Sequence, residues 1–159
     1  MKRNVVCTSL SIVSLIMLSL SLVPVAHATK CSTALTAGSW DYTYTGTLFT
    51  TGGPLPLASV GRYTQDSAGN VSGSQVRSVA GVPGVEDVVS TIPVQQDCTA
   101  SAAVGVYVNG QLQRTAQVAF VFDSNGNHFR AIFQSLTLPN GTNVPVVITV
   151  EGNKLFPTD

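Results

Sequence analysis

Charged residues are scarce in this sequence, which has eight Lys plus Arg and eight Asp plus Glu among 159 residues. After residue 28 the chain carries six basic and eight acidic side chains, a net charge near −2. That balance offers no basic surface for nucleic acid or for an anionic membrane, so neither is expected as a partner. Thr, Ser, Gln and Asn provide most of the polarity instead, which is typical of a secreted β protein.

Histidine and cysteine are also rare, and this limits the chemistry that the chain can perform. His128 is the only histidine after residue 28, and the two cysteines there are 67 positions apart with no CxxC pair. A zinc site needs about four such ligands, so no metal site is predicted. Phosphate-binding and dinucleotide-binding glycine loops and a G-x-S-x-G elbow are absent, so we predict no cofactor, no catalytic residues and no enzymatic activity.

The N-terminal 28 residues have the pattern of a cleaved signal peptide. Lys2 and Arg3 precede an apolar stretch over residues 7–23, and Ala26-His27-Ala28 supplies the small residues that signal peptidase reads. The alternative is an uncleaved membrane anchor, but several serines interrupt the stretch and the cleavage site follows directly. We therefore expect export to the periplasm or the extracellular space. The mature part, residues 29–159, is the size of one domain and has no further membrane span.

Two cysteines remain after cleavage of the signal peptide, Cys31 and Cys98. In an exported chain such a pair is expected to form one disulfide. Free or metal-bound thiols are the alternative.

Strand patterns fill the rest of the chain, and no window shows a helical apolar period. Alternation of apolar and polar residues begins at Trp40, and Pro54 and Pro56 interrupt it before it resumes. A loop is expected at Gly81–Gly84, and Pro93 is expected at an edge or a bulge. The predicted strands cover residues 40–48, 60–65, 71–80, 85–95, 99–108, 111–123, 128–138 and 144–151.

Turn signals join these strands in sequence order. Asn109-Gly110, Asn125-Gly126 and Asn140-Gly141 are strong hairpin signals, because Asn and Gly tolerate the positive φ of tight turns. The motif Asp-Ser-x-Gly-Asn occurs twice, at Asp66 and at Asp123. It has one acidic ligand and no closing Glu, so we interpret it as a hairpin turn and not as a calcium loop.

An antiparallel meander of about eight strands with one apolar face can close on itself. The apolar side chains of residues 112–122 fall on one face, and those of residues 144–150 repeat the pattern. We predict an all-β fold with a single up-and-down barrel. A β-sandwich is the alternative.

Three motifs resemble a group of small exported bacterial proteins of unassigned function. They are Cys31 followed by Gly38-Ser39-Trp40-Asp41-Tyr42, the stretch Ala58–Gly73 with D-x-x-G-N-x-S-G, and Asp97-Cys98-Thr99. The chain departs from the pattern after Thr99, where Ala and Val replace the usual Gly-Thr. The resemblance implies export and a lipocalin-like barrel, and it implies no catalytic residues.

Candidate ligand-binding residues are aromatic and cationic. If the apolar face of residues 112–122 points inward, Arg114 and Phe120 also point inward, and Arg62 and Arg77 are on comparable faces of their strands. A buried Arg needs a partner, which could be an Asp, the ring of Trp40 or Tyr42, or the acidic head of a ligand. The alternative is that these Arg side chains lie near the barrel mouths, in solvent or on the outer face. That alternative is favoured, because the register of the first strands is least defined.

Three functions fit these features. The first is non-enzymatic binding of a small apolar ligand inside the barrel. The second is a protein-interaction module of the periplasm or cell surface, with an exposed apolar patch. The third is a barrel isomerase or cyclase, which would need a buried carboxylate, with Asp41 and Glu151 as the candidates.

Overall fold

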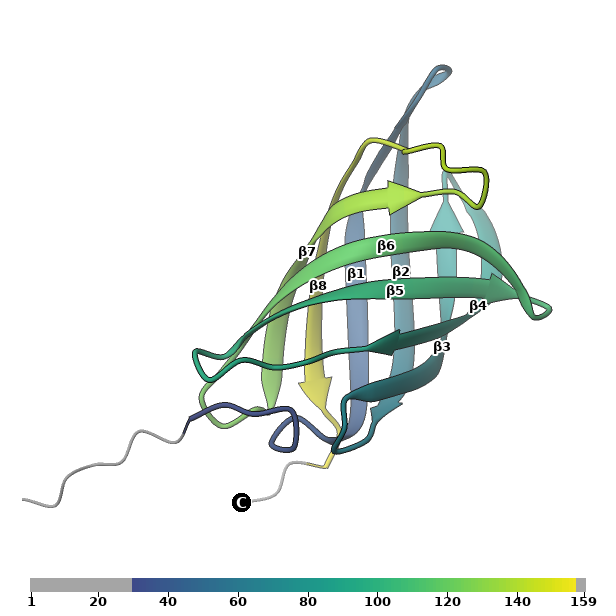
Figure 1. Ribbon diagram of the computed structural model, residues 1–159. Helices are drawn as coiled ribbons and strands as arrows, with labels where there is room; N and C mark the ends of the chain where they lie inside the picture. Colours follow the sequence, from purple (N-terminus) through teal and green to yellow (C-terminus); the bar gives the residue numbers. More distant parts are fainter. Residues whose placement is uncertain (1–29, 157–159) are drawn as a thin grey trace, which may run out of the picture.

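The computed structural model of the protein, which describes residues 30–156, is a closed antiparallel barrel of eight strands (Figure 1). The predicted all-β up-and-down barrel is thus confirmed, and the sandwich alternative is wrong. The predicted signal peptide, residues 1–28, lies outside the described residues. Within those residues, no helix has the length and apolar character needed to cross a membrane.

The strands follow one another round the barrel in chain order, and β1 pairs with β8 to close it. Side chains alternate between the interior and solvent along each strand, as the period of two in the sequence predicts. On β6, for example, Ala116, Val118, Phe120 and Phe122 are buried. The strands are β1 (Gly38–Thr50), β2 (Gly53–Gln65), β3 (Asn70–Val79), β4 (Val82–Thr91), β5 (Thr99–Val108), β6 (Gln111–Phe122), β7 (His128–Thr137) and β8 (Val146–Lys154).

Two strands are longer than predicted at their N-terminal ends. Pro54 and Pro56 do not interrupt β2, because that stretch pairs with β1 while β3 begins its pairing only at Leu57. A proline is tolerated where a strand has a free edge. The loop expected at Gly81–Gly84 is instead a two-residue turn, since Val79 pairs with Val82 and both Ala80 and Gly81 have positive φ.

The Asp-Ser-x-Gly-Asn repeat forms a hairpin turn at both places, as predicted, and the second turn closes one residue later, at His128 instead of Asn127. Asp66 Oδ1 accepts hydrogen bonds from the backbone N–H groups of Ala68 and Asn70. Asp123 Oδ1 accepts from the N–H groups of Asn127 and His128 in the second turn. The pKa of Asp66 is lowered chiefly by a hydrogen bond from the Asn70 side chain, so the carboxylate stays ionised and holds the turn.

One end of the barrel is covered by the segment that precedes β1, and we call it the closed end. The disulfide Cys31–Cys98 ties this segment to the start of β5, with the two Cα atoms 5.0 Å apart. Thr36, which is fully buried, accepts hydrogen bonds from the Trp40 indole N–H at its carbonyl and from the Gln65 side chain at its hydroxyl. Both ends of the described chain lie at this end, and we call the opposite end the far end (Figure 1).

Candidate functional site

An internal cavity of about 70 Å³ lies in the barrel between an aromatic layer and a charged cluster. Seventeen residues line it in total, most of them are apolar, and each of the eight strands contributes at least one. Its walls include Tyr42, Tyr63, Val71, Val88, Ile92, Val104, Val106, Ala116, Val118, Phe120, Phe129, Phe133 and Val150. The interior is therefore not completely filled, and it offers a mainly apolar space.

Aromatic rings form the layer between this cavity and the closed end. The Trp40 ring stacks on Tyr63 with a centroid distance of 6.1 Å and contacts Phe122 and Phe129 at 5.9 and 5.4 Å. Trp40 has no exposed surface. Such ring pairs stabilise beyond their buried area, by about 1 kcal/mol each. The layer gives the cavity a rigid base.

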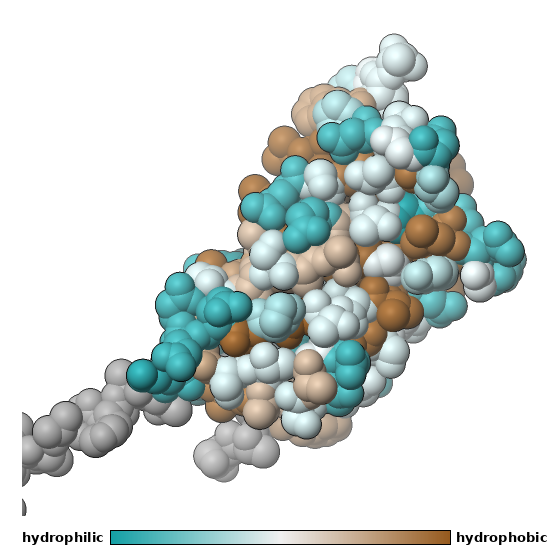
Figure 2. Space-filling model, viewed as in Figure 1, coloured by the Kyte–Doolittle hydropathy of each residue, from teal (hydrophilic) through white to brown (hydrophobic). Residues whose placement is uncertain are grey.

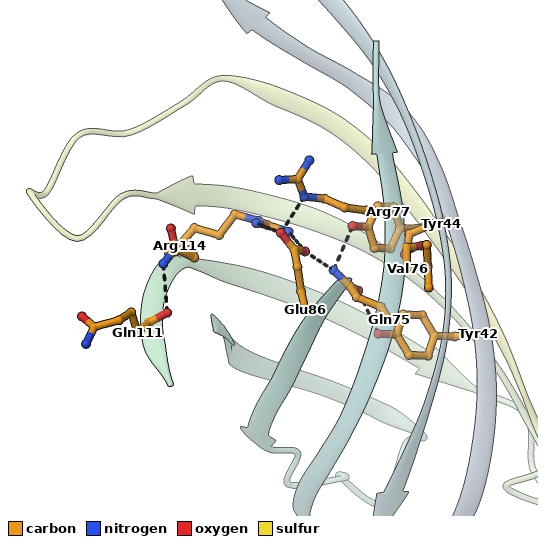
Figure 3. Close-up of polar contacts among 10 residues, drawn as sticks. Tyr42, Tyr44, Gln75, Val76, Arg77, Glu86, Gln111 and Arg114 are labelled. Carbon is orange, nitrogen blue, oxygen red and sulfur yellow. Dashed lines mark hydrogen bonds and ion pairs between the residues drawn. The ribbon is translucent and has the colours of Figure 1, made fainter. Parts of the chain in front are cut away.

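A charged cluster, drawn in Figure 3, lies toward the far end, and its members Gln75 and Arg114 line the cavity. Glu86 on β4 is its centre, with a side chain that is 1% exposed. The Arg114 guanidinium donates to both Glu86 carboxylate oxygens at 2.7 and 2.5 Å, and Arg77 Nε donates to Oε1 at 2.5 Å. Gln75 Nε2 donates to the other oxygen at 2.7 Å. The carboxylate thus accepts four hydrogen bonds from three residues on two strands, β3 and β6.

Two tyrosines extend this cluster across the barrel to β1. The Tyr42 hydroxyl donates to Gln75 Oε1 at 2.8 Å, and Gln75 Nε2 also donates to the Tyr44 hydroxyl at 3.1 Å. Burial, followed by the nearby Tyr44 and Glu86, raises the pKa of Tyr42 well above its usual value, so the hydroxyl remains a neutral donor. The network therefore spans the barrel from β6 to β1 (Figure 3).

The electrostatics of the cluster keep Glu86 ionised. Burial alone would raise the pKa of this carboxyl, but the hydrogen bonds from Arg114 and Arg77 outweigh burial and lower the pKa to about 2. The ion pair also acts on Arg114. Burial alone would lower the pKa of this guanidinium, but the bonds to Glu86 outweigh burial and raise it. Two guanidinium groups and one carboxylate leave the cluster with a charge of +1.

One residue that lines the cavity has a buried polar atom without a partner. The Tyr63 hydroxyl is buried and makes no hydrogen bond to any other described residue, although its ring lines the cavity. Burial raises the pKa of Tyr63, so this hydroxyl is neutral and able to donate. An unsatisfied buried hydroxyl costs about 1–3 kcal/mol, and it is an unusual feature in a folded protein.

The predicted site residues lie in three different places. Tyr42, Arg114 and Phe120 line the cavity. Trp40 lies behind the cavity in the aromatic layer, and Arg77 belongs to the charged cluster without lining the cavity. Arg62 points outward to solvent, since Gly61 and Tyr63 face the interior on either side of it.

The interpretation that the Arg side chains lie near the barrel mouths, in solvent or on the outer face fits Arg62, which is on the outer face, whereas Arg77 and Arg114 point into the barrel toward its far end. Both pair inside the barrel with Glu86, whose side chain is nearly fully buried. The carboxylates named for an enzyme are also placed differently. Glu151 is 64% exposed, where it faces Arg130, and Asp41 lies on the outer side of β1, where it accepts a hydrogen bond from Asn153 N–H.

Glu86, Gln75 and Tyr63 are the site residues that sequence reasoning missed. The available signal was the two-residue turn at Ala80-Gly81, which fixes the register of β4 against β3 and places Glu86 opposite Gln75. In residues 30–156, no three side chains of His, Cys, Asp or Glu come together as metal ligands.

Among known proteins, a resemblance is found for the structure and none for the sequence. No known protein family matches the sequence, and no curated protein matches it. A redesigned β-barrel is among the solved structures that resemble it, with 16% sequence identity and a TM-score of 0.48. The match covers 78% of this chain and 95% of the designed one.

Proposed function

We propose that this protein is an exported binding protein that holds one small, mainly apolar molecule in the barrel cavity. The observation that carries the proposal is the mainly apolar cavity inside the barrel, with the unpartnered hydroxyl of Tyr63 on a residue that lines it. An apolar pocket with one or a few convergent polar groups is the usual design of a small-molecule site. A ligand that accepts a hydrogen bond from Tyr63 would remove the cost of the buried, unsatisfied hydroxyl.

The size of the cavity restricts the ligand. A water needs about 10–15 Å³ of such space, so about 70 Å³ accommodates roughly five waters or a compact organic group of similar size. Sites for drug-sized ligands are larger, at about 300–1,000 Å³. The ligand class is therefore a compact ring or short chain with one hydroxyl or carbonyl group.

The ligand is expected to be neutral. The charges that adjoin the cavity are already engaged with each other, because Arg114 and Arg77 both bind Glu86. A cationic ligand would meet the net charge of +1 on the cluster, and an anionic ligand would have to compete with Glu86 for the two guanidinium groups, so both are costly. A neutral molecule loses only the water on its own surface and gains the contact with Tyr63.

Export and binding without turnover are parts of the same proposal. The signal-peptide pattern over residues 1–28 supports export, and so does the disulfide Cys31–Cys98, since disulfides persist in oxidising compartments. The resemblance to small exported bacterial proteins agrees with export. For the binding role, Glu86 is held ionised between two guanidinium groups, and a carboxylate in that state is a poor acid or base for catalysis.

The test compares phenol with toluene, which have similar shapes and differ by one hydroxyl group. Dissociation constants for both are measured by NMR titration with wild-type protein, with Tyr63→Phe and with Tyr107→Phe. Tyr107 is the control, because it lies outside the cavity lining. One hydrogen bond is worth about 1 kcal/mol, so Tyr63→Phe should lower the preference for phenol over toluene by roughly fivefold.

Tyr107→Phe should leave that preference unchanged, and toluene should bind Tyr63→Phe as it binds the wild type. Retained toluene binding shows that the variant folds. An unchanged phenol preference in Tyr63→Phe would refute the role of the hydroxyl. Absence of binding by both compounds to the wild-type protein would refute a ligand of this class.

A further inference from the structure

A row of three valines crosses the outer face of β2, β3 and β4. Val60 pairs with Val76, and Val76 pairs with Val85, so the three side chains are direct cross-strand neighbours. They are 58%, 50% and 70% exposed. Ala58, Ser78 and Pro83 form the next row toward the far end, and it has no charged residue. We call Val60, Val76 and Val85 the valine row.

Apolar residues elsewhere on the outer surface are more isolated. Val121 on β6 is 59% exposed, but its cross-strand neighbours are Thr99 and Arg130. On the face that carries β5 and β6, Figure 2 shows apolar side chains separated by polar ones. The ladders β5–β6 and β6–β7 also contain register shifts, whereas β2–β3 and β3–β4 are regular. The valine row therefore lies on the more regular part of the wall.

Opposite charges flank the valine row on its other side. The adjacent row toward the closed end is Arg62, Ser74 and Asp87, with Arg62 on β2 and Asp87 on β4. Among the described residues, neither Arg62 nor Asp87 forms an ion pair. The two charges thus flank Ser74 of β3, with Arg62 on one side of it and Asp87 on the other. A shallow groove runs over this surface, and its lining includes the valine row, Arg62 and Ser74, with Leu155 and Phe156 from the segment after β8.

We propose that this face is the interface of a symmetric homodimer, with the two-fold axis running along β3. Rotation about such an axis places β2 of one copy against β4 of the other. Val76 then meets its own counterpart, and Val60 meets the partner's Val85 on both sides. The same rotation brings Arg62 to the partner's Asp87, twice. The face is thus self-complementary in both apolar character and charge.

The twist of the two sheets agrees with this arrangement. Regular sheets pack face to face with their strands aligned to within about 30°, which an axis along β3 produces. The central valines would lose water, while the Arg62 and Asp87 pairs would lie at the rim and set the register of the two copies. The inference concerns the outer wall and is independent of the ligand proposed for the cavity.

The first test replaces the central valine. Wild-type protein and the variants Val76→Lys and Val121→Lys are compared by sedimentation velocity from low to high micromolar concentration. We expect the wild type to pass from monomer to dimer in this range. Val76→Lys should remain monomeric throughout, because two lysines would meet on the axis, while Val121→Lys should associate as the wild type does.

The second test exchanges the charges. Arg62→Asp and Asp87→Arg should each weaken dimerisation at least tenfold, because each places like charges together twice. The double variant should return to within about threefold of the wild-type dissociation constant, since every pair is again opposite in sign. A wild type that is monomeric at all concentrations overturns the proposal, as does a dimer unaffected by Val76→Lys. A double variant no tighter than the single ones overturns the proposed axis.

Discussion

The charged cluster around Glu86 permits a quantitative prediction for the variant Glu86→Gln. The carboxylate is nearly fully buried and is held by Arg77 and Arg114, which are themselves only 28% and 16% exposed. Its pKa falls from 4.5 to about 2 in the folded protein, and each pKa unit corresponds to 1.36 kcal/mol. The ionised carboxylate therefore stabilises the fold by about 3 kcal/mol at neutral pH. Loss of one member of a buried ion pair has a similar cost, about 3–5 kcal/mol.

We accordingly expect Glu86→Gln to lower the free energy of unfolding by about 3 kcal/mol at pH 7. For a domain of this size, that loss corresponds to a fall in Tm on the order of 10 °C. Urea unfolding can be followed by fluorescence, because Trp40 is the only tryptophan and is completely buried. Glu151→Gln is the matched control. Glu151 faces Arg130 at 3.5 Å, but both side chains are largely exposed, so the loss should be below about 1 kcal/mol.

The same cluster fixes the sign of the pH dependence. A depressed folded-state pKa gives stability that is fully present above the unfolded-state value near 4.5 and is lost as pH falls through about 2. Wild type and Glu86→Gln should therefore converge in stability between pH 5 and pH 2, because a protonated Glu resembles Gln. If the difference between them is the same at pH 7 and pH 2.5, or if Glu86→Gln costs no more than Glu151→Gln, the assigned role of the cluster is refuted.

Two further predictions concern the backbone. Replacing Cys31 and Cys98 together with Ser should reduce the free energy of unfolding by about 4 kcal/mol, because the bridge closes a loop of 67 residues; an unchanged urea midpoint in the variant would contradict this. Gly46→Ala should destabilise the barrel by about 1–3 kcal/mol, since a Cβ there would clash with the backbone of Val147 and Ile148 across the β1–β8 ladder. Gly52→Ala is its control in thermal unfolding, because its Cβ would meet only a distant Thr50 hydroxyl, and equal losses in the two variants would refute the steric argument.

The barrel could be predicted because its signals are local. The alternation over residues 112–122 and the Asn-Gly turn at 109–110 each determine structure within one hairpin, and Asn109 and Gly110 both have the expected positive φ. The prolines led to a wrong start for β2, because a proline ends a strand only where a neighbouring strand needs its N–H. β3 does not pair with β2 at Pro54 and Pro56, and only the three-dimensional arrangement shows this.

The site could be predicted only in part, because it depends on which alternate residues of each short strand face the barrel interior. On β4 the adjacent acids Glu86 and Asp87 face opposite sides, and the alternation around them fits either assignment. The same ambiguity separates Arg77, which points inward, from Arg62, which points outward. Tyr63 could not be recognised as a site residue from its sequence neighbours. It stands out only because its buried hydroxyl has no hydrogen-bond partner in the folded protein.

The ladder between β4 and β5 has a consequence for access to the interior. These strands pair only over residues 87–89 and 105–107, whereas β1 and β2 pair over thirteen positions on each strand. Val88 and Val106 form the middle pair of that short ladder, and both line the cavity. Separating β4 from β5 breaks fewer backbone hydrogen bonds than opening any other ladder of the barrel. The wall thus has its shortest ladder where the cavity lies directly behind it, and the Glu86–Arg114 ion pair, which joins β4 to β6, ties the two sides of this seam together.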